Sequence, residues 1–308
     1  MTIYVTGHGI VGRRVARLLG DHPVVFHDPR HEPTPATRPG DVAVLAHPAE
    51  HCPVARAFGE GGASVVTVGD DIDDAHELIM LGDLFDEAGS TLVVGAGMSP
   101  GLSGLLARHL AGQLASIDEI HVAIHGTAGP ACARTHHRSL SRRAPGWHDG
   151  EWVDYVGGSG RELCWFPEPV GAKDCYRADI SDPLLLRAAF PEADRISARR
   201  SARRRDRLTA RLPMLSPPHQ EGGMGALRVE VRGADHRGGR VCSIVGVAEL
   251  VGTATAATAA AFTTMSLDGK LAPGLVVAGD TCAPTLQLLQ LIESFGVTLQ
   301  EFTGRPQR

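Results

Sequence analysis

Three glycines close to the N-terminus have a spacing that suits phosphate binding. They stand in the run Gly7-His8-Gly9-Ile10-Val11-Gly12, between an apolar segment and a segment with helical periodicity. In this G-x-G-x-x-G setting Gly7 allows a tight turn, Gly9 lets a phosphate approach the backbone, and Gly12 lets the helix lie close to the strand. Free N–H groups at the start of the helix add a partial positive charge. The run therefore predicts a dinucleotide site formed by Gly7, His8, Gly9, Ile10, Val11 and Gly12.

An acidic residue follows at the position where such a site contacts the adenosine ribose. Asp28 comes directly after the short apolar segment Val24-Val25-Phe26-His27. A carboxylate there accepts hydrogen bonds from the ribose and repels a 2′-phosphate, which favours NAD as the cofactor. Arg30 is able to bind a 2′-phosphate instead, so NADP, or use of both cofactors, stays open. A plain polar turn at Asp28-Pro29-Arg30 is the other alternative.

Basic side chains gather between Gly126 and Arg138, after the first strand of a second predicted domain. Two of them are arginines four residues apart, so on a helix they share one face, where two guanidinium groups are able to hold a carboxylate. Two adjacent histidines lie between them, and either is able to exchange a proton near neutral pH. The alternative is a solvated helix start with no specific role. The predicted catalytic residues are Arg134, His136, His137 and Arg138.

Other charged segments are further candidates for substrate contacts. Arg161-Glu162 follows a glycine-rich turn, and Lys173-Asp174 follows another glycine. The arginine run from Arg195 to Arg211 could bind a phosphate, a carboxylated substrate or an acidic partner. Adjacent arginines cannot all face one pocket from a strand or a helix, so we expect most of this run to be solvated.

Alternating strand and helix patterns position the glycine run and Asp28. Apolar strands at 2–6, 24–26, 41–46, 63–68 and 91–94 alternate with helical segments at 13–19, 49–58, 71–88 and 102–114. This order predicts a Rossmann-type doubly wound parallel sheet, which is an α/β fold whose ligand lies at the carboxyl ends of the strands. We expect residues 1–115 to form the dinucleotide-binding domain.

The pattern changes after residue 115. Ile120, Val122 and Ile124 alternate with His121, Ala123 and His125, which predicts a half-buried strand. Short strands follow, and 226–231 and 240–251 are expected to pair in an antiparallel way. Residues 116–251 are therefore expected to form an α+β mixed-sheet domain for substrate binding and dimerisation. Helices at 251–265 and 281–295 and a strand at 297–302 are expected in the segment 252–308, which would return to the dinucleotide-binding domain.

Composition excludes several classes of protein. The 308 residues carry a formal net charge of −5, with no long apolar run and no nucleic-acid motif, so neither nucleic acid nor a membrane is an expected partner. The six cysteines are scattered without a C-x-x-C pair, and the fifteen histidines form no metal-binding pattern, so no metal site is expected. No signal-peptide pattern precedes the first strand. We expect a cytoplasmic homodimer that acts on a small molecule.

Two segments together resemble the saccharopine dehydrogenase-like oxidoreductases. One is Val5-Thr6-Gly7-His8-Gly9-Ile10-Val11-Gly12, and the other is Gly95-Ala96-Gly97-Met98-Ser99-Pro100-Gly101-Leu102-Ser103, which is similar to the family's G-x-x-P-G turn. The resemblance implies hydride transfer with NAD or NADP at a C–N bond of an amino-acid-derived substrate, with Gly97, Met98 and Ser99 beside the nicotinamide. Considered alone, the turn is a strand-to-helix loop with Ser99 as N-cap and Pro100 at the first helical position.

Two other functions stay open for this sequence. An enoyl or carbonyl reductase would use the same fold, cofactor and arginines. A sensor or scaffold protein that binds NAD(P) without turnover is the alternative from another class, because the resemblance assigns no catalytic residue in the second domain.

The glycine run generates a direct test. Gly9→Val places a branched side chain where the pyrophosphate must approach the backbone, so dinucleotide-induced thermal stabilisation should disappear while the protein stays folded. Differential scanning fluorimetry with NAD, NADH, NADP and NADPH measures the stabilisation. Undiminished stabilisation of the variant would refute the assignment.

Overall fold

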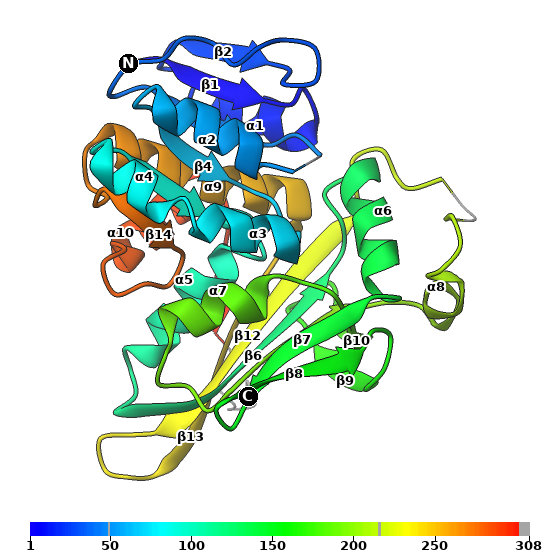
Figure 1. The fold of residues 1–308 in the computed structure, drawn as a ribbon. Helices are drawn as coiled ribbons and strands as arrows, with labels where there is room; N and C mark the ends of the chain where they lie inside the picture. Colours follow the sequence, from blue (N-terminus) through cyan, green and yellow to red (C-terminus); the bar gives the residue numbers. More distant parts are fainter. Residues whose placement is uncertain (49, 215–216, 302–308) are drawn as a thin grey trace.

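The computed structural model describes residues 1–48, 50–214 and 217–301 and contains two sheets (Figure 1). The first sheet has six strands, and the second has nine. The helices lie in the segments that connect the strands. Within the described residues, no helix has the length and apolar character needed to cross a membrane.

The first sheet is parallel throughout, as predicted. Its strand order is β2-β1-β3-β4-β5-β14, so the chain changes direction between β1 and β3, where open α/β sheets bind their ligands. Apolar strands such as β3 and β5 are buried along their whole length, as expected for a sheet with helices on both faces. The strands are β1 (Ile3–Thr6), β2 (Val24–His27), β3 (Val42–Leu45), β4 (Ser64–Thr67), β5 (Thr91–Val94) and β14 (Gly274–Val277).

The helices of this region correct one expectation. The segment 71–88 forms two helices rather than one, because a turn at Met80-Leu81 separates them. Gly82 begins the second helix, and a Cβ there would lie 3.2 Å from Cβ of Leu275, so the turn brings the chain close to β14. The predicted helix start at Ala49 lies outside the described residues. The helices are α1 (Ile10–Leu18), α2 (Cys52–Glu60), α3 (Ile72–Ile79), α4 (Gly82–Glu87) and α5 (Leu102–Ala111).

The second sheet is mixed, as predicted. β6 pairs with β11 in parallel and with β12 in an antiparallel way, and β12 pairs with β13 along eleven residues of each strand. The path is β15-β13-β12-β6-β11-β10-β9, and β7 pairs with β11 and β8. The strands are β6 (Ser116–His125), β7 (Arg143–His148), β8 (Glu151–Val156), β9 (Glu162–Trp165), β10 (Ala172–Arg177), β11 (Arg195–Ser201), β12 (Met224–Ala234), β13 (Arg240–Leu250) and β15 (Leu299–Glu301).

The alternation of β6 is confirmed. Ile120, Val122 and Ile124 are buried in the main hydrophobic core, whereas His121 and His125 are only half-buried on the other face. Ala123 departs from the prediction, because it is buried on that other face in a small separate cluster with Cys164, Phe166, Cys175 and Ala226. Three helices accompany this sheet, namely α6 (Pro130–Ser139), α7 (Asp182–Ala189) and α8 (Arg204–Thr209).

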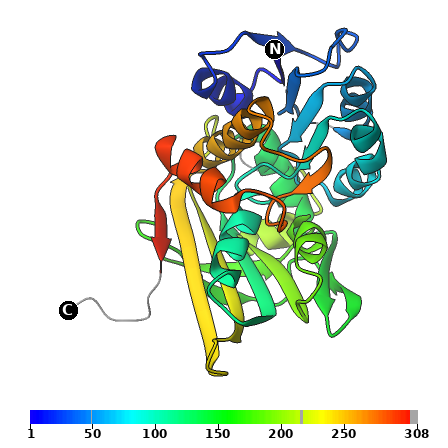
Figure 2. The same cartoon turned by 90° about the vertical axis from the view of Figure 1, so that its left-hand side faces the viewer.

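The C-terminal part of the chain contributes to both sheets (Figure 2). β14 extends the first sheet beside β5, whereas β15 pairs with β13 of the second sheet. The expected closing strand thus covers Leu299–Glu301, and Phe302 lies outside the described residues. Between them lie α9 (Val251–Leu267) and α10 (Thr285–Ser294). α9 contacts α1, α10, β3, β4 and β13, and its alanines are fully buried because small side chains permit this close approach.

Helix α10 provides a matched test of the core. Leu288 is fully buried in the main core, whereas Leu286 on the same helix is 65% exposed. Leu288→Ala should lower the free energy of unfolding by about 2–5 kcal/mol, and Leu286→Ala by less than about 0.5 kcal/mol. Urea unfolding measures both variants. Equal losses would contradict the packing described for α10.

Candidate active site

The glycine run lies between β1 and the start of α1. Gly7 has a φ of +93°, and a Cβ there would lie 2.8 Å from the carbonyl oxygen of Ala46, at the end of β3. A Cβ on Gly12 would lie 2.1 Å from the carbonyl oxygen of Gly7, so only glycine permits this contact between helix and turn. Gly9 differs from both, since a Cβ there would have no atom within 4 Å. Gly9 thus precedes α1 at an open position, and no side chain caps the helix.

These features fit a dinucleotide pyrophosphate. The open space at Gly9 and the uncapped N–H groups of α1 offer hydrogen-bond donors and a partial positive charge to an anion. Of the other residues in the run, His8 is exposed and its ring lies 4.8 Å from that of Phe26, while Ile10 and Val11 are half-buried.

Asp28 and Arg30 are paired with each other. Nε of Arg30 donates to Oδ1 of Asp28 over 3.0 Å, and Nη2 donates to Oδ2 over 2.8 Å. These hydrogen bonds from Arg30 hold the pKa of the Asp28 carboxyl well below its usual range. The carboxylate that favours NAD and the guanidinium that suits NADP therefore lie at one point, directly after β2.

The Gly95–Gly101 turn follows β5 at the same edge of the sheet. Gly101 has a φ of +133°, and a Cβ there would lie 2.4 Å from the carbonyl oxygen of Gly97. Met98 is buried, and its N–H donates to Oγ1 of Thr255 in α9 over 3.2 Å. The interpretation of Ser99 as a helix N-cap is wrong, because α5 begins at Leu102 after Gly101.

The Ser99 hydroxyl instead binds the second half of the molecule. It donates to Oδ2 of Asp182, at the start of α7, over 2.7 Å, and the Ser103 hydroxyl donates to Oδ1 over 2.5 Å. Asp182 is fully buried, and burial raises the pKa of its carboxyl to about 6, although the two hydroxyl groups oppose the shift. Asp182 thereby joins α7 to the turn.

The two predicted histidines of α6 have different surroundings. Nε2 of His136 lies 3.1 Å from Oδ2 of Asp70, in the segment that follows β4. Nε2 of His137 instead lies 3.0 Å from the carbonyl oxygen of Thr209 and 3.2 Å from that of Leu212. Only His136 therefore contacts the carboxyl edge of the first sheet. Just before α6, a Cβ on Gly129 would lie 2.7 Å from Cδ1 of Ile10, so this helix also begins beside the glycine run.

Asp70 connects His136 to a buried arginine. A carboxylate accepts only, so Nε2 of His136 carries the proton in this contact. The same Asp70 Oδ2 lies 3.7 Å from Nη2 of Arg200 in β11. Cys132 Sγ lies 3.1 Å from Nε2 of His136, and burial raises the pKa of this thiol to about 12, so Cys132 stays a neutral thiol. We call Asp70, Cys132, His136 and Arg200 the edge cluster.

Arg200 differs from the rest of the arginine run. It is 3% exposed, and its Nε and Nη1 have no hydrogen-bond partner within the described part of the chain. Burial lowers the pKa of its guanidinium, although the carboxylate of Asp70 opposes this shift, and an arginine still remains charged. The predicted pair Arg134 and Arg138 lies on the exposed side of α6, where Nε of Arg138 donates to the carbonyl oxygen of Arg134.

The other sequence candidates lie away from the edge cluster. Arg161 forms an ion pair with Asp174 at 2.9 Å, and Glu162 forms one with Arg199 at 2.7 Å. Lys173 lies opposite Cys164 in the pairing of β10 with β9. In the described ranges, no group of three or more His, Cys, Asp or Glu side chains is arranged to hold a metal ion.

Asp70 and Asp182 are not among the residues predicted from the sequence. Cys132 lies inside the predicted segment 126–138 and Arg200 inside the arginine run 195–211, but neither is singled out there. Asp70 could have been found, because it follows β4 and strand ends in such sheets meet at one edge. Asp182 carries no comparable signal, and the sequence does not distinguish Arg200 from its neighbours in the arginine run, since each residue reaches the site only through the packing of the two sheets.

Comparisons with known proteins locate the fold. No protein-family model matches the sequence, and neither does any curated protein. Among solved structures, the apo histidine-tagged saccharopine dehydrogenase (L-Glu forming) from Saccharomyces cerevisiae has a TM-score of 0.67 at 14% identity, covering 98% of this chain and 99% of that chain. DAP dehydrogenase from C. glutamicum in complex with DAP has a TM-score of 0.51 at 15% identity, covering 95% and 98%.

At these identities the similarity establishes the fold. The predicted fold class, a doubly wound parallel sheet with a second mixed-sheet domain, is confirmed. The resemblance to saccharopine dehydrogenase-like oxidoreductases is confirmed at the level of the fold.

The buried Asp182 predicts a pH effect on stability. Its pKa is about 6 in the folded protein and about 4 when unfolded, so between these values the folded state binds the extra proton. Stability due to this group is therefore highest below the unfolded pKa and falls, by up to about 3 kcal/mol, as pH rises through the folded pKa.

Urea unfolding across this pH range checks the effect. As pH rises, the free energy of unfolding should decline less steeply for Asp182→Asn than for the unmodified protein. This difference in slope is expected whatever the difference in absolute stability between the two proteins. Asp21→Asn, at an exposed residue, is the matched control and should follow the unmodified protein. Parallel curves for Asp182→Asn and the unmodified protein would show that this prediction is wrong.

Proposed function

We propose that this chain is an NAD(P)-dependent oxidoreductase that acts at a C–N bond of a small, carboxylated, amino-acid-derived substrate. The observation that carries the proposal is the buried, incompletely paired guanidinium of Arg200, which lies beside the Asp70–His136 contact at the carboxyl edge of the first sheet. The named activities of saccharopine dehydrogenase and DAP dehydrogenase, which share the fold, are consistent with this substrate class.

The chain's own residues account for cofactor binding. Gly7, Gly9 and Gly12 would hold the pyrophosphate at the start of α1, and Asp28 with Arg30 would contact the adenosine ribose. Gly97, Met98 and Ser99 would lie beside the nicotinamide, which supplies the hydride acceptor or donor when it is bound.

His136 is the proposed site of proton exchange. Asp70 accepts the Nε2 proton of His136, which orients the imidazole and fixes its tautomer. A histidine held in this way is able to take a proton from a substrate amine or return one near neutral pH. The neutral Cys132 thiol beside it adds no charge that would compete for this proton.

Arg200 is the proposed contact for the substrate carboxylate. A buried donor without a partner is unfavourable, and a carboxylate would satisfy Nε and Nη1 with charge-assisted hydrogen bonds. We therefore propose Arg200 for this role, in place of the exposed Arg134 and Arg138. Asp182 and the Ser99 hydroxyl would hold the turn in position beside this contact.

Two histidine variants test the proposal. First, fluorimetry with the four nicotinamide dinucleotides identifies the cofactor, and amine and imine substrates are screened by absorbance of the reduced nicotinamide. His136→Asn should then lower turnover by about a hundredfold or more and flatten its pH dependence near neutrality. His137→Asn should keep the shape of the pH profile, because His137 contacts only backbone carbonyls of the 209–212 segment.

These measurements test cofactor binding and the proton-exchange role of His136 separately. Absence of a thermal shift with every dinucleotide contradicts the proposed cofactor. A dinucleotide shift with an unchanged pH profile in His136→Asn retains cofactor binding and contradicts the proton-exchange role.

A further inference from the structure

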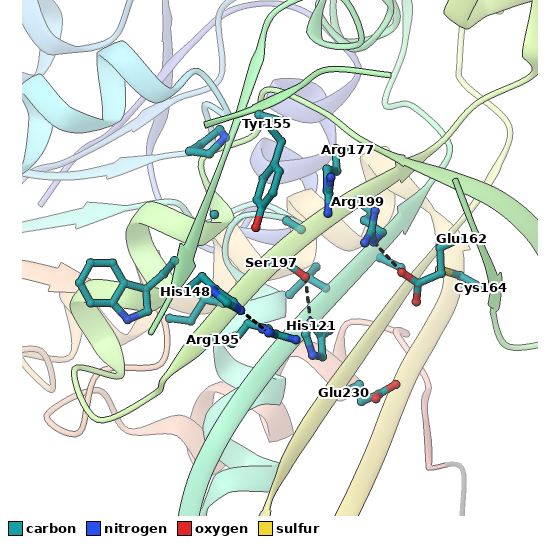
Figure 3. A pocket seen from close by; sticks show the side chains of 18 of the residues that line it. His121, His148, Tyr155, Glu162, Cys164, Arg177, Arg195, Ser197, Arg199 and Glu230 are labelled. Atoms are coloured by element: carbon teal, nitrogen blue, oxygen red, sulfur yellow. Dashed lines mark hydrogen bonds and ion pairs between the residues drawn. The ribbon is translucent and has the colours of Figure 1, made fainter. Parts of the chain in front are cut away.

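A cavity lies on the face of the second sheet that points away from the main hydrophobic core. Its volume is about 320 Å³, and its floor is formed by β6, β11 and β12. Walls from β9, β10 and the β7–β8 hairpin enclose it (Figure 3). The size is within the range of small-molecule sites.

Strand β11 separates this cavity from the edge cluster. Successive side chains of a strand point to opposite faces. Ser197 and Arg199 accordingly line the cavity, whereas Arg200 is buried on the side of Asp70. On β6, His121 and Ala123 line the cavity and Ile120 lies in the main core. The cavity is therefore distinct from the proposed dinucleotide site.

Positive charge dominates the cavity. Its lining contains two glutamates, Glu162 and Glu230, and Glu119 beside it pairs with two of the arginines. The arginines outnumber these three acids by two, and they are Arg177, Arg195, Arg199, Arg228 and Arg232. Such an excess in a concave, partly desolvated space attracts anions.

The deepest charges are already paired. Glu230 is 7% exposed in its side chain and receives hydrogen bonds from Arg228 and Arg232. Arg199 pairs with Glu162 and also donates to the carbonyl oxygen of Gly160 over 2.6 Å. These contacts hold the floor of the cavity in place.

Arg177 is not paired with a carboxylate within the described residues. Its guanidinium instead lies over the ring of Tyr155, 3.7 Å from the ring centre, which is a cation–π contact. Figure 3 shows the Arg177 and Tyr155 side chains side by side, with Ser197 and His121 opposite them. Nδ1 of His121 and Oγ of Ser197 are hydrogen-bonded over 2.8 Å. The guanidinium donors of Arg177 are thus available to a ligand.

We propose that this cavity binds a small organic anion through its carboxylate or phosphate group, with Arg177 as the principal contact. Guanidinium donors match both groups, and the neighbouring tyrosine and tryptophan rings of the hairpin supply surface for the rest of the molecule. The site stands independently of the proposed function, since it shares no residue with the glycine run or the edge cluster.

Isothermal titration calorimetry on the full chain, at constant ionic strength, tests this site. Inorganic phosphate and citrate are the probes, and their relative affinities distinguish a phosphate ligand from a carboxylate ligand. Arg177→Met should weaken binding about tenfold or more, because one charge-assisted contact is lost. Arg237→Met, at an exposed arginine on the β12–β13 turn, should leave the affinity unchanged.

Two further variants locate the anion. The N-terminus of α1 is a competing site for phosphate, and Gly9→Val blocks it. This variant should still bind the probe, because the cavity is unchanged; loss of binding in this variant overturns the proposal. Arg195→Gln removes a rim charge that is 42% exposed and should weaken binding even if Arg177→Met fails to fold. Failure of both probes to bind the unmodified protein at millimolar concentration also overturns it, and so does binding by Arg177→Met and Arg195→Gln that is as tight as that of the unmodified protein.

Discussion

The carboxylate of Asp182 links the two halves of the molecule through buried hydrogen bonds. It is fully buried and accepts hydrogen bonds from Ser99 in the Gly95–Gly101 turn and from Ser103 in α5. A buried charge without these hydroxyl groups would be strongly unfavourable, so turn, helix and carboxylate have to assemble together. The contact thereby connects α7 to α5 and to the turn after β5, at the edge where the proposed active site lies.

The charged residues of the proposed active site come from distant segments of the chain that meet at the carboxyl edge of the first sheet. Asp70 follows β4, His136 lies on α6 and Arg200 lies on β11, yet Oδ2 of Asp70 lies near both basic groups. A carboxylate between an imidazole and a guanidinium offsets the cost of burying Arg200 in part, and leaves two nitrogens of the guanidinium without a hydrogen-bond partner within the described residues. Strand β11 then carries a second arginine, Arg199, to the opposite face, so one strand supplies two chemically different surfaces.

Much of the fold follows from local patterns. The apolar strands and the glycine run predict a parallel sheet with a ligand at its carboxyl ends, and β6 shows the expected alternation except at Ala123, which is buried as well. Predictions from the sequence pattern were wrong at positions where packing against distant residues decides the local geometry. The segment 71–88 divides at Met80-Leu81, directly before Gly82, which lies against β14, almost two hundred residues away in the chain. Ser99 does not cap a helix, because α5 begins three residues later, at Leu102, and the Ser99 hydroxyl donates to Asp182 instead.

The sequence by itself determined the class of fold and the place of the glycine run, because hydrophobic periodicity and the steric freedom of glycine act over a few residues. Only the tertiary structure decided which basic residues share a site. His136 and His137 are adjacent and chemically identical, and Arg199 and Arg200 are as well, yet within each pair the two side chains have different partners. Those partners are set by long-range packing of the two sheets, on which neighbouring residues in the chain carry no information.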